Sequence, residues 1–226
     1  MKKYGYRQRI GLFWDFIISG WQAMRGLYVL SKLPYPMVTI FGGTHAPLDE
    51  NHAKQAAQLA ALCARNNISV ITGGGPGIMQ AANCAAKGKT LGIGLYGVDD
   101  DFNNPCTQVI KVNHFYVRRW LLIQYSLGFV IFPGGIGTMN ELFDLLNDRK
   151  HNKVLAMPIV LVDVAYWSPL IMWFKESALK QGYVDPDYLK LFVVTDDVQE
   201  AFNIMQKGWQ ELERKSNDKK IDINER

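Results

Sequence analysis

The sequence predicts an α/β fold, a doubly wound and mainly parallel Rossmann-like sheet in a single domain behind an N-terminal helical extension. Short apolar runs alternate with longer stretches of helical periodicity from residue 37 to residue 213. Runs such as 158–162 are apolar throughout, as expected of strands covered by helices on both faces. Glycine-rich stretches follow several of these runs, and an open parallel sheet binds its ligands at that edge.

The elements follow in order along the chain. Strands are predicted at residues 37–41, 68–72, 90–95, 107–112, 128–132, 158–162 and 192–195. Helices are predicted at about residues 49–65, 76–87, 114–127, 137–148, 166–181 and 197–213. This alternation of strands and helices favours a parallel sheet with helical crossovers. Residues 1–36 are assigned to the extension, 37–213 to the Rossmann-like domain and 214–226 to a charged tail that frays or extends the last helix.

The extension contains an apolar stretch whose spacing continues as a helix through Trp21, Met24, Leu27 and Leu30. Asp15 interrupts the stretch, no small-residue cleavage site follows it, and it is too short to span a bilayer. We expect an amphipathic helix that packs on the body or on a partner subunit. Peripheral membrane contact is the less favoured alternative.

The net charge of +4 comes from the first ten residues, which contain Lys2, Lys3, Arg7 and Arg9 and no acid. The rest of the chain carries 21 basic and 21 acidic residues. A neutral body is a poor electrostatic match for DNA or RNA, so no nucleic-acid partner is expected.

Three scattered cysteines, Cys63, Cys84 and Cys106, indicate no disulfide framework and a reducing, cytoplasmic compartment. The four histidines have no zinc-type spacing with them, so no metal is expected.

Four stretches fall at the predicted carboxyl ends of strands, at residues 41–44, 72–79, 114–119 and 133–141. Each leads into a helix, so their backbone N–H groups should face one crevice. Residues 133–141 read Pro-Gly-Gly-Ile-Gly-Thr-Met-Asn-Glu. A strand that ends in a glycine-rich turn at a helix start is a phosphate cradle, and Glu141 adds one carboxylate to its rim.

Other interpretations stay open for these stretches. Thr138 and Glu141 have the spacing of a capping box, in which the glutamate would bind backbone instead of serving chemistry. Gly42 and Gly43 by themselves suit a tight turn. The triple glycine at 73–75, followed by Pro76, favours contact with phosphate or ribose.

The Arg118–Arg119 pair lies at a predicted helix start, where the helix dipole disfavours cations. A bound anion would compensate for that position, so the pair is a candidate for substrate contact. Neither glycine cluster fits Gly-x-Gly-x-x-Gly, because Gln80 and Asn140 stand where the third glycine would be. The chain also has no Walker-type P-loop and no Gly-x-Ser-x-Gly.

Residues 133–141 match the Pro-Gly-Gly-x-Gly-Thr-x-x-Glu signature of the Lonely Guy family, nucleoside 5′-monophosphate phosphoribohydrolases often mislabelled as lysine decarboxylases. Residues 115–119 resemble the family's Met-x-x-Arg-Lys segment, with Arg119 in place of the lysine. Residues 72–79 resemble its second glycine loop, and the likeness extends over about residues 37–208.

The resemblance implies that Arg118 and Glu141 are the catalytic pair. It implies that Gly135, Gly137 and Thr138 hold the 5′-phosphate, with Gly74 and Gly75 on the opposite wall. The remaining implied substrate contacts are Gly43, Arg119 and Gly134.

The implied reaction splits the N-glycosidic bond of a purine nucleoside 5′-monophosphate, AMP or an N6-modified AMP, with no cofactor and no metal. A homodimer or larger homo-oligomer is also implied. A non-catalytic nucleotide sensor or carrier with the same crevice is the alternative. Lysine decarboxylation is disfavoured because no lysine stands out for a Schiff base.

Overall fold

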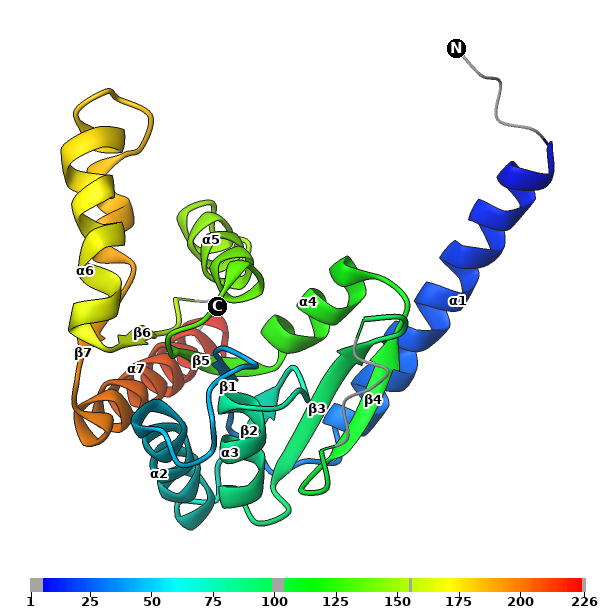
Figure 1. Ribbon diagram of the computed structural model, residues 1–226, viewed down its shortest axis with the longest axis horizontal. Helices are drawn as coiled ribbons and strands as arrows, with labels where there is room; N and C mark the ends of the chain where they lie inside the picture. The colour runs from blue at the N-terminus through cyan, green and yellow to red at the C-terminus, as the bar shows by residue number, and fades with distance from the viewer. Residues whose placement is uncertain (1–5, 99–103, 155, 225–226) are drawn as a thin grey trace.

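The computed structural model describes residues 6–98, 104–154 and 156–224. Within these residues seven strands form one sheet in the order β4-β3-β2-β1-β5-β6-β7, and every pairing is parallel (Figure 1). The strands are β1 Met37–Phe41, β2 Ser69–Thr72, β3 Thr90–Leu95, β4 Gln108–Val112, β5 Ser126–Ile131, β6 Ile159–Val162 and β7 Val193–Thr195. The predicted parallel α/β fold is confirmed.

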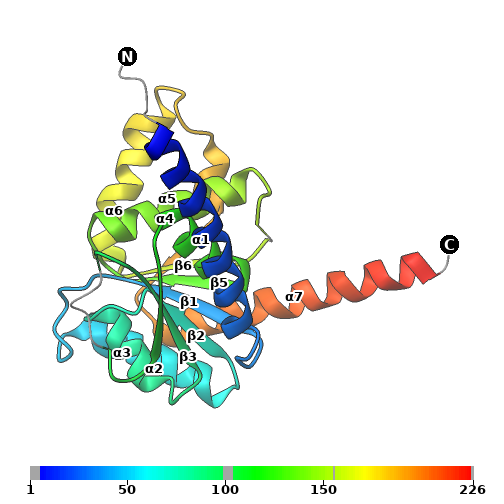
Figure 2. The same cartoon turned by 90° about the vertical axis from the view of Figure 1, so that its right-hand side faces the viewer.

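Helices cover both faces of the sheet. They are α1 Tyr6–Leu30, α2 Asn51–Arg65, α3 Ile78–Ala85, α4 Phe115–Gln124, α5 Ile136–Lys150, α6 Val164–Trp173 and α7 Val198–Asn224. Helices α2, α3 and α7 lie on one face and α4, α5 and α6 on the other, with α1 beside α4 (Figures 1 and 2). The central strands β1 and β5 are buried along their whole length, as their apolar sequences predict.

The order of the strands positions the site. From β1 the chain moves outward through β2 and β3 to β4, and α4 then carries it back to β5 on the other side of β1. The loops that follow β1 and β5 therefore lead in opposite directions and leave a crevice between them, which is where doubly wound sheets bind ligands.

Two helical regions differ in detail from the prediction. The helix expected at 166–181 is α6 continued by a π-helix, Phe174–Leu179, and a short 3-10 helix, Pro186–Lys190, precedes β7. The charged tail extends α7 to Asn224, and this helix projects away from the body (Figure 2).

Helix α1 packs on the body through only half of the face that its apolar residues predicted. Leu30 is buried and Leu27 packs against the core, but Trp21 and Met24 are 63% and 67% exposed. In the turns before Leu27 the buried residues are Ser19 and Gln22. The Gln22 side chain donates to Oδ1 of Asn113 at 2.9 Å and accepts from the backbone N–H of Asn113 at 2.9 Å, which fixes this side of the helix toward the body. None of the described helices combines the length and apolar character needed to traverse a bilayer.

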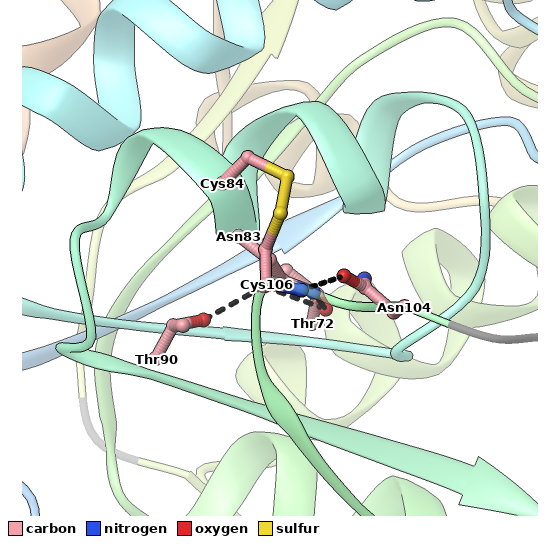
Figure 3. The surroundings of a disulfide bond; sticks show 6 residues. All are labelled: Thr72, Asn83, Cys84, Thr90, Asn104 and Cys106. Atoms are coloured by element: carbon pink, nitrogen blue, oxygen red, sulfur yellow. Dashed lines mark hydrogen bonds between the residues drawn. A yellow bond between two sulfur atoms is a disulfide. The ribbon is translucent and has the colours of Figure 1, made fainter.

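The prediction that the cysteines are unpaired is wrong. Cys84 at the end of α3 forms a disulfide with Cys106, just before β4, while Cys63 is a buried free thiol (Figure 3). The inference of a reducing, cytoplasmic compartment loses the support that it took from unpaired cysteines. The two partners are 22 residues apart in sequence and meet only because β3 and β4 are neighbours in the sheet.

Candidate active site

A cavity of about 690 Å³ opens at the carboxyl edge of the sheet. Its walls come from the stretches after β1, β2 and β5 and from the first turns of α4, α5 and α6. The four stretches expected to face one crevice therefore do so. The lining residues used below are Gly43, His52, Gly73, Gly75, Arg118, Gly134, Gly135, Gly137, Thr138, Glu141 and Tyr166.

Arg118 and Glu141 meet in this cavity. Nη1 of Arg118 lies 3.4 Å from Oε1 of Glu141, and their side chains are only 16% and 15% exposed. Arg118 also donates from Nε to the backbone oxygen of Ile93 in β3, at 2.8 Å. This second bond fixes the guanidinium over the sheet, with Nη1 toward Glu141 and Nη2 over Gly73. The structure brings the predicted pair together, and its catalytic role stays a prediction.

The capping-box interpretation of Glu141 does not hold. Helix α5 begins at Ile136 with Gly135 as its N-cap residue, and no side chain caps it. Thr138 is thus the third helical residue and Glu141 lies in the second turn, beyond the reach of a capping box. The carboxylate is presented to the cavity instead.

The start of α5 has the geometry of an anion site. The first N–H groups of an α-helix have no acceptor within the helix, and the dipole makes that end positive. A β-carbon at Gly135 or at Gly137 would meet nothing within 4 Å, so both glycines leave open space. Thr138 is buried, and its Oγ1 fills the space beside Gly134.

The loops after β1 and β5 are tied to each other. The N–H of Gly43 donates to the backbone oxygen of Pro133 at 2.9 Å, and the Gly43 oxygen accepts from the N–H of Ile78 at 3.2 Å. The amide of Gly43 is thus engaged in the fold, as the tight-turn interpretation expected, although the residue still lines the cavity.

In the second glycine loop, the residues that face the cavity are not the two that were expected. Gly73 and Gly75 line the cavity, but Gly74 does not. The N–H of Gly74 donates to Oγ1 of Thr72 at 3.0 Å, and a β-carbon there would lie 3.2 Å from the Gly92 Cα in β3. Gly74 therefore faces the sheet, and the predicted wall is formed by its two neighbours.

A buried network holds this loop in place. Nδ2 of Asn83 donates to Oγ1 of Thr72 at 3.0 Å, and Oγ1 of Thr90 donates to Oδ1 of Asn83 at 2.7 Å (Figure 3). All three side chains are buried. Since Thr72 in turn accepts from the Gly74 N–H, the network couples α3 and β3 to the cavity wall.

Arg119 points away from the main cavity. Its Nη2 lies 2.6 Å from Oδ2 of Asp144 and donates to Oδ1 of Asn140 at 2.9 Å. Arg119 lines a separate recess of about 40 Å³ next to Arg118 and Glu141. Burial raises the pKa of Asp144, and the charge of Arg119 opposes that rise. In this structure Arg119 joins α4 to α5 and does not reach the glycine-rich cradle.

The sequence did not predict the part of the cavity wall that is formed by the starts of α2 and α6. Nε2 of His52 lies 2.8 Å from Oδ2 of Asp163, and Nδ1 of His52 lies 3.3 Å from Oε1 of Glu50. Oδ1 of Asp163 caps α6 by accepting from the N–H of Tyr166 at 2.9 Å. The Tyr166 hydroxyl donates to the backbone oxygen of Gly134 at 2.5 Å. The start of α6 thus supports the loop that begins the cradle.

Within the described parts of the chain, no three His, Cys, Asp or Glu side chains gather in a way that could hold a metal ion. The cavity presents backbone amides, one guanidinium and carboxylates from separate elements, a set that suits a phosphorylated and hydroxylated ligand.

Comparison with known proteins decides the family. A family model described as "possible lysine decarboxylase" matches residues 61–205. A Mycobacterium tuberculosis protein named cytokinin riboside 5′-monophosphate phosphoribohydrolase is 30% identical over 168 residues, which cover 70% of this chain and 85% of the relative. The chain belongs to this family, the Lonely Guy family. A Rhodococcoides fascians relative of the same name is 26% identical over 175 residues, covering 73% of this chain and 86% of its own. As a Lonely Guy protein the chain is an enzyme, and the resemblance recognised in residues 133–141 is confirmed.

Solved structures agree on the fold of this Lonely Guy protein. A molybdenum cofactor binding protein from Rippkaea orientalis superimposes with a TM-score of 0.57 at 20% identity, covering 76% of this chain and 96% of that one. The molybdenum cofactor carrier protein of Chlamydomonas reinhardtii gives a TM-score of 0.56 at 19% identity, covering 77% and 98%. At these identities the likeness concerns the fold alone.

Proposed function

We propose that the protein hydrolyses the N-glycosidic bond of a purine nucleoside 5′-monophosphate, AMP or an N6-modified AMP, to free base and ribose 5-phosphate. The observation that carries the proposal is the 3.4 Å approach of Arg118 to Glu141 in a cavity that also contains the glycine-rich start of α5. The names of the curated relatives, cytokinin riboside 5′-monophosphate phosphoribohydrolases, support the same substrate class.

In the proposed complex the 5′-phosphate binds the first turn of α5. The amides of Gly137 and Thr138 face it there, and the missing side chains of Gly135 and Gly137 leave it room. Glu141 lies four residues beyond Gly137, about 6 Å along the helix axis. That separation is comparable to the span from a nucleotide's 5′-phosphate to its anomeric carbon, so an anchored phosphate sets the ribose beside the carboxylate.

The chemistry needs an anion at that position. As the bond from C1′ to the base nitrogen breaks, its electron pair leaves with the base and positive charge develops on the ribose ring. A fixed carboxylate stabilises that charge as the transition state forms. Water then supplies the oxygen that bonds to C1′, and its proton is accepted by Glu141 or by the departing base. The bonds of Arg118 to Glu141 and to the Ile93 oxygen orient the carboxylate.

The experiment is an assay for base release by the purified protein with AMP, GMP, CMP and an N6-modified AMP as separate substrates. Release of adenine or of the N6-modified base, with equimolar ribose 5-phosphate, is the expected result. Binding of these nucleotides without release of any base would reject the enzymatic proposal and favour a nucleotide sensor or carrier.

We also propose that the protein is a homo-oligomer. Apolar side chains of α4 and α5 are exposed beside the cavity, including Phe115 at 58%, Tyr116 at 56% and Ile136 at 86%. Large exposed apolar side chains on neighbouring helices are typical of subunit interfaces. Light scattering coupled to size exclusion should give at least twice the mass of one chain, and a monomer at micromolar concentration would contradict the proposal.

A further inference from the structure

Helix α1 is attached to the body by polar and small residues and, at its last residue, by Leu30. The buried positions are spaced three and four apart, at Ser19, Gln22, Gly26 and Leu30. The amide of Gln22 forms two hydrogen bonds with Asn113, and a β-carbon at Gly26 would lie 2.5 Å from Cδ1 of Leu121 in α4. Since a larger residue at position 26 would clash with Leu121, α4 fixes which side of α1 faces the body.

The opposite side of α1 is aromatic and aliphatic. Six large apolar residues there are between 46% and 67% exposed: Phe13, Trp14, Ile17, Trp21, Met24 and Tyr28. Phe16 and Ile18, 72% and 41% exposed, lie on the two flanks of this face by helical spacing. The helix runs along the edge of the molecule and projects beyond it, so that the body does not cover this face (Figure 1). An apolar surface of this extent marks an interaction site.

The charge of the sequence at the N-terminal end of α1 indicates which kind of surface the exposed face meets. The first ten residues contain four basic and no acidic residues, whereas residues 11–226 carry 21 of each. A second copy of the chain therefore offers no excess of acid to match the basic end. An anionic bilayer offers both a negative surface for the basic residues and an apolar interior for the aromatic face.

We propose that α1 docks the protein on the surface of an anionic lipid bilayer. The helix lies in the plane of the membrane with its aromatic face toward the acyl chains and with the body on the aqueous side. Trp14, Trp21 and Tyr28 suit this depth, because their rings are apolar with one polar edge. The side that contacts the body is opposite, so docking leaves the contacts of Gln22 and Gly26 intact.

Cosedimentation of the full chain with vesicles tests the proposal. The protein should pellet with vesicles of phosphatidylcholine and phosphatidylglycerol, pellet at least tenfold less with phosphatidylcholine alone, and be released by added salt. The double variant Trp14→Glu/Trp21→Glu should lose at least tenfold in partitioning, since both side chains are exposed and the substitutions put charge into the apolar face. Ile17→Glu/Met24→Glu is an independent second variant on the same face.

Tyr183→Glu is the matched control, because Tyr183 is 80% exposed and lies outside α1. It should bind vesicles like the parent protein. Failure of the parent to pellet with either vesicle, or equal binding by the variants and the parent, overturns the proposal. If the parent does not bind vesicles, and the mass of the native assembly in solution is instead halved in both α1 variants, the face contacts a second copy of the chain. Circular dichroism and base release verify that each variant is folded.

Discussion

Gly73 has no side chain where the guanidinium of Arg118 passes: a β-carbon built at Gly73 would overlap with Nη2 of Arg118 and lie 2.9 Å from Sδ of Met79. The absence of a side chain at Gly73 thus gives the Arg118 guanidinium the room that it needs to reach Glu141. Its position at the end of β2 makes the second glycine loop part of the arginine's support as well as a wall of the cavity.

Gly73→Ala should therefore displace Arg118 without removing it. We expect about a 100-fold fall in the rate of base release, the order of magnitude that a 1 Å misplacement costs. Steady-state kinetics on AMP measure the fall. Gly20→Ala is the control, because a β-carbon at Gly20 meets nothing within 4 Å. Full activity of Gly73→Ala would show that Arg118 is not needed at its present position.

Glu141→Gln keeps the size of the side chain and removes its charge. Base release should fall by about 100- to 1000-fold, as is usual when one electrostatic stabiliser of a transition state is lost. Nucleotide affinity by calorimetry should remain within a few-fold of the parent, because the phosphate is held by backbone amides. Glu176→Gln is the matched control and should be fully active, because Glu176 is an exposed residue of the π-helix outside the cavity. A Glu141→Gln enzyme with parental turnover would remove the carboxylate from the mechanism.

The burial of Asp144 should appear in the pH dependence of stability. Burial raises the pKa of this carboxyl, while Arg119 lowers it and Asp148 raises it further, so the folded state holds the proton more tightly than the unfolded state. Its stabilising contribution is therefore complete below the ordinary value of 3.8 and declines as the pH rises through the folded pKa. Urea unfolding of the parent and of Asp144→Asn across this range should show the difference in unfolding free energy decreasing with pH. A constant difference would contradict the raised pKa.

Thiol counting tests the disulfide and the buried cysteine together. Burial raises the pKa of Cys63 to about 12, so its thiol is unreactive in the native protein. An aromatic disulfide reagent should label no cysteine in the native state, one after unfolding and three after unfolding with reductant, since Cys84 and Cys106 are paired. Three reactive thiols on unfolding without reductant would show that the pair is reduced in the purified protein.

Much of the fold was predictable because the apolar runs are bounded by clear signals. Strands β1 and β3 begin and end where predicted, since the prolines at 34 and 36 and the glycines at 42 and 88 mark the turns beside them. The orientation of α1 was not predictable in this way. Its apolar content is the same whichever side faces the body, and the choice depends on the pairing of Gln22 with Asn113, 91 residues away.

The candidate site was likewise predictable only where a local sequence motif marks a residue. Arg118 and Glu141 were found because each sits next to a recognisable motif at the end of a strand. His52 and Tyr166 were missed because no glycine-rich stretch marks the starts of α2 and α6, although both line the cavity. Arg119 was expected to contact substrate, and this contact stays a prediction. Its pairing with Asp144 was not predicted, because Asp144 lies one helical turn past the signature.

The hydrogen bond from the Gly43 N–H to the Pro133 oxygen links the loop after β1 to the loop after β5. From these two loops the chain proceeds to opposite edges of the sheet. Neither half of the sheet forms the cavity by itself. Arg118 is on the helix after β4, Glu141 on the helix after β5 and Tyr166 on the helix after β6. The candidate site therefore exists only when these distant segments have all paired. Recovered turnover is consequently a reporter of the completed sheet, whereas recovered helicity is not.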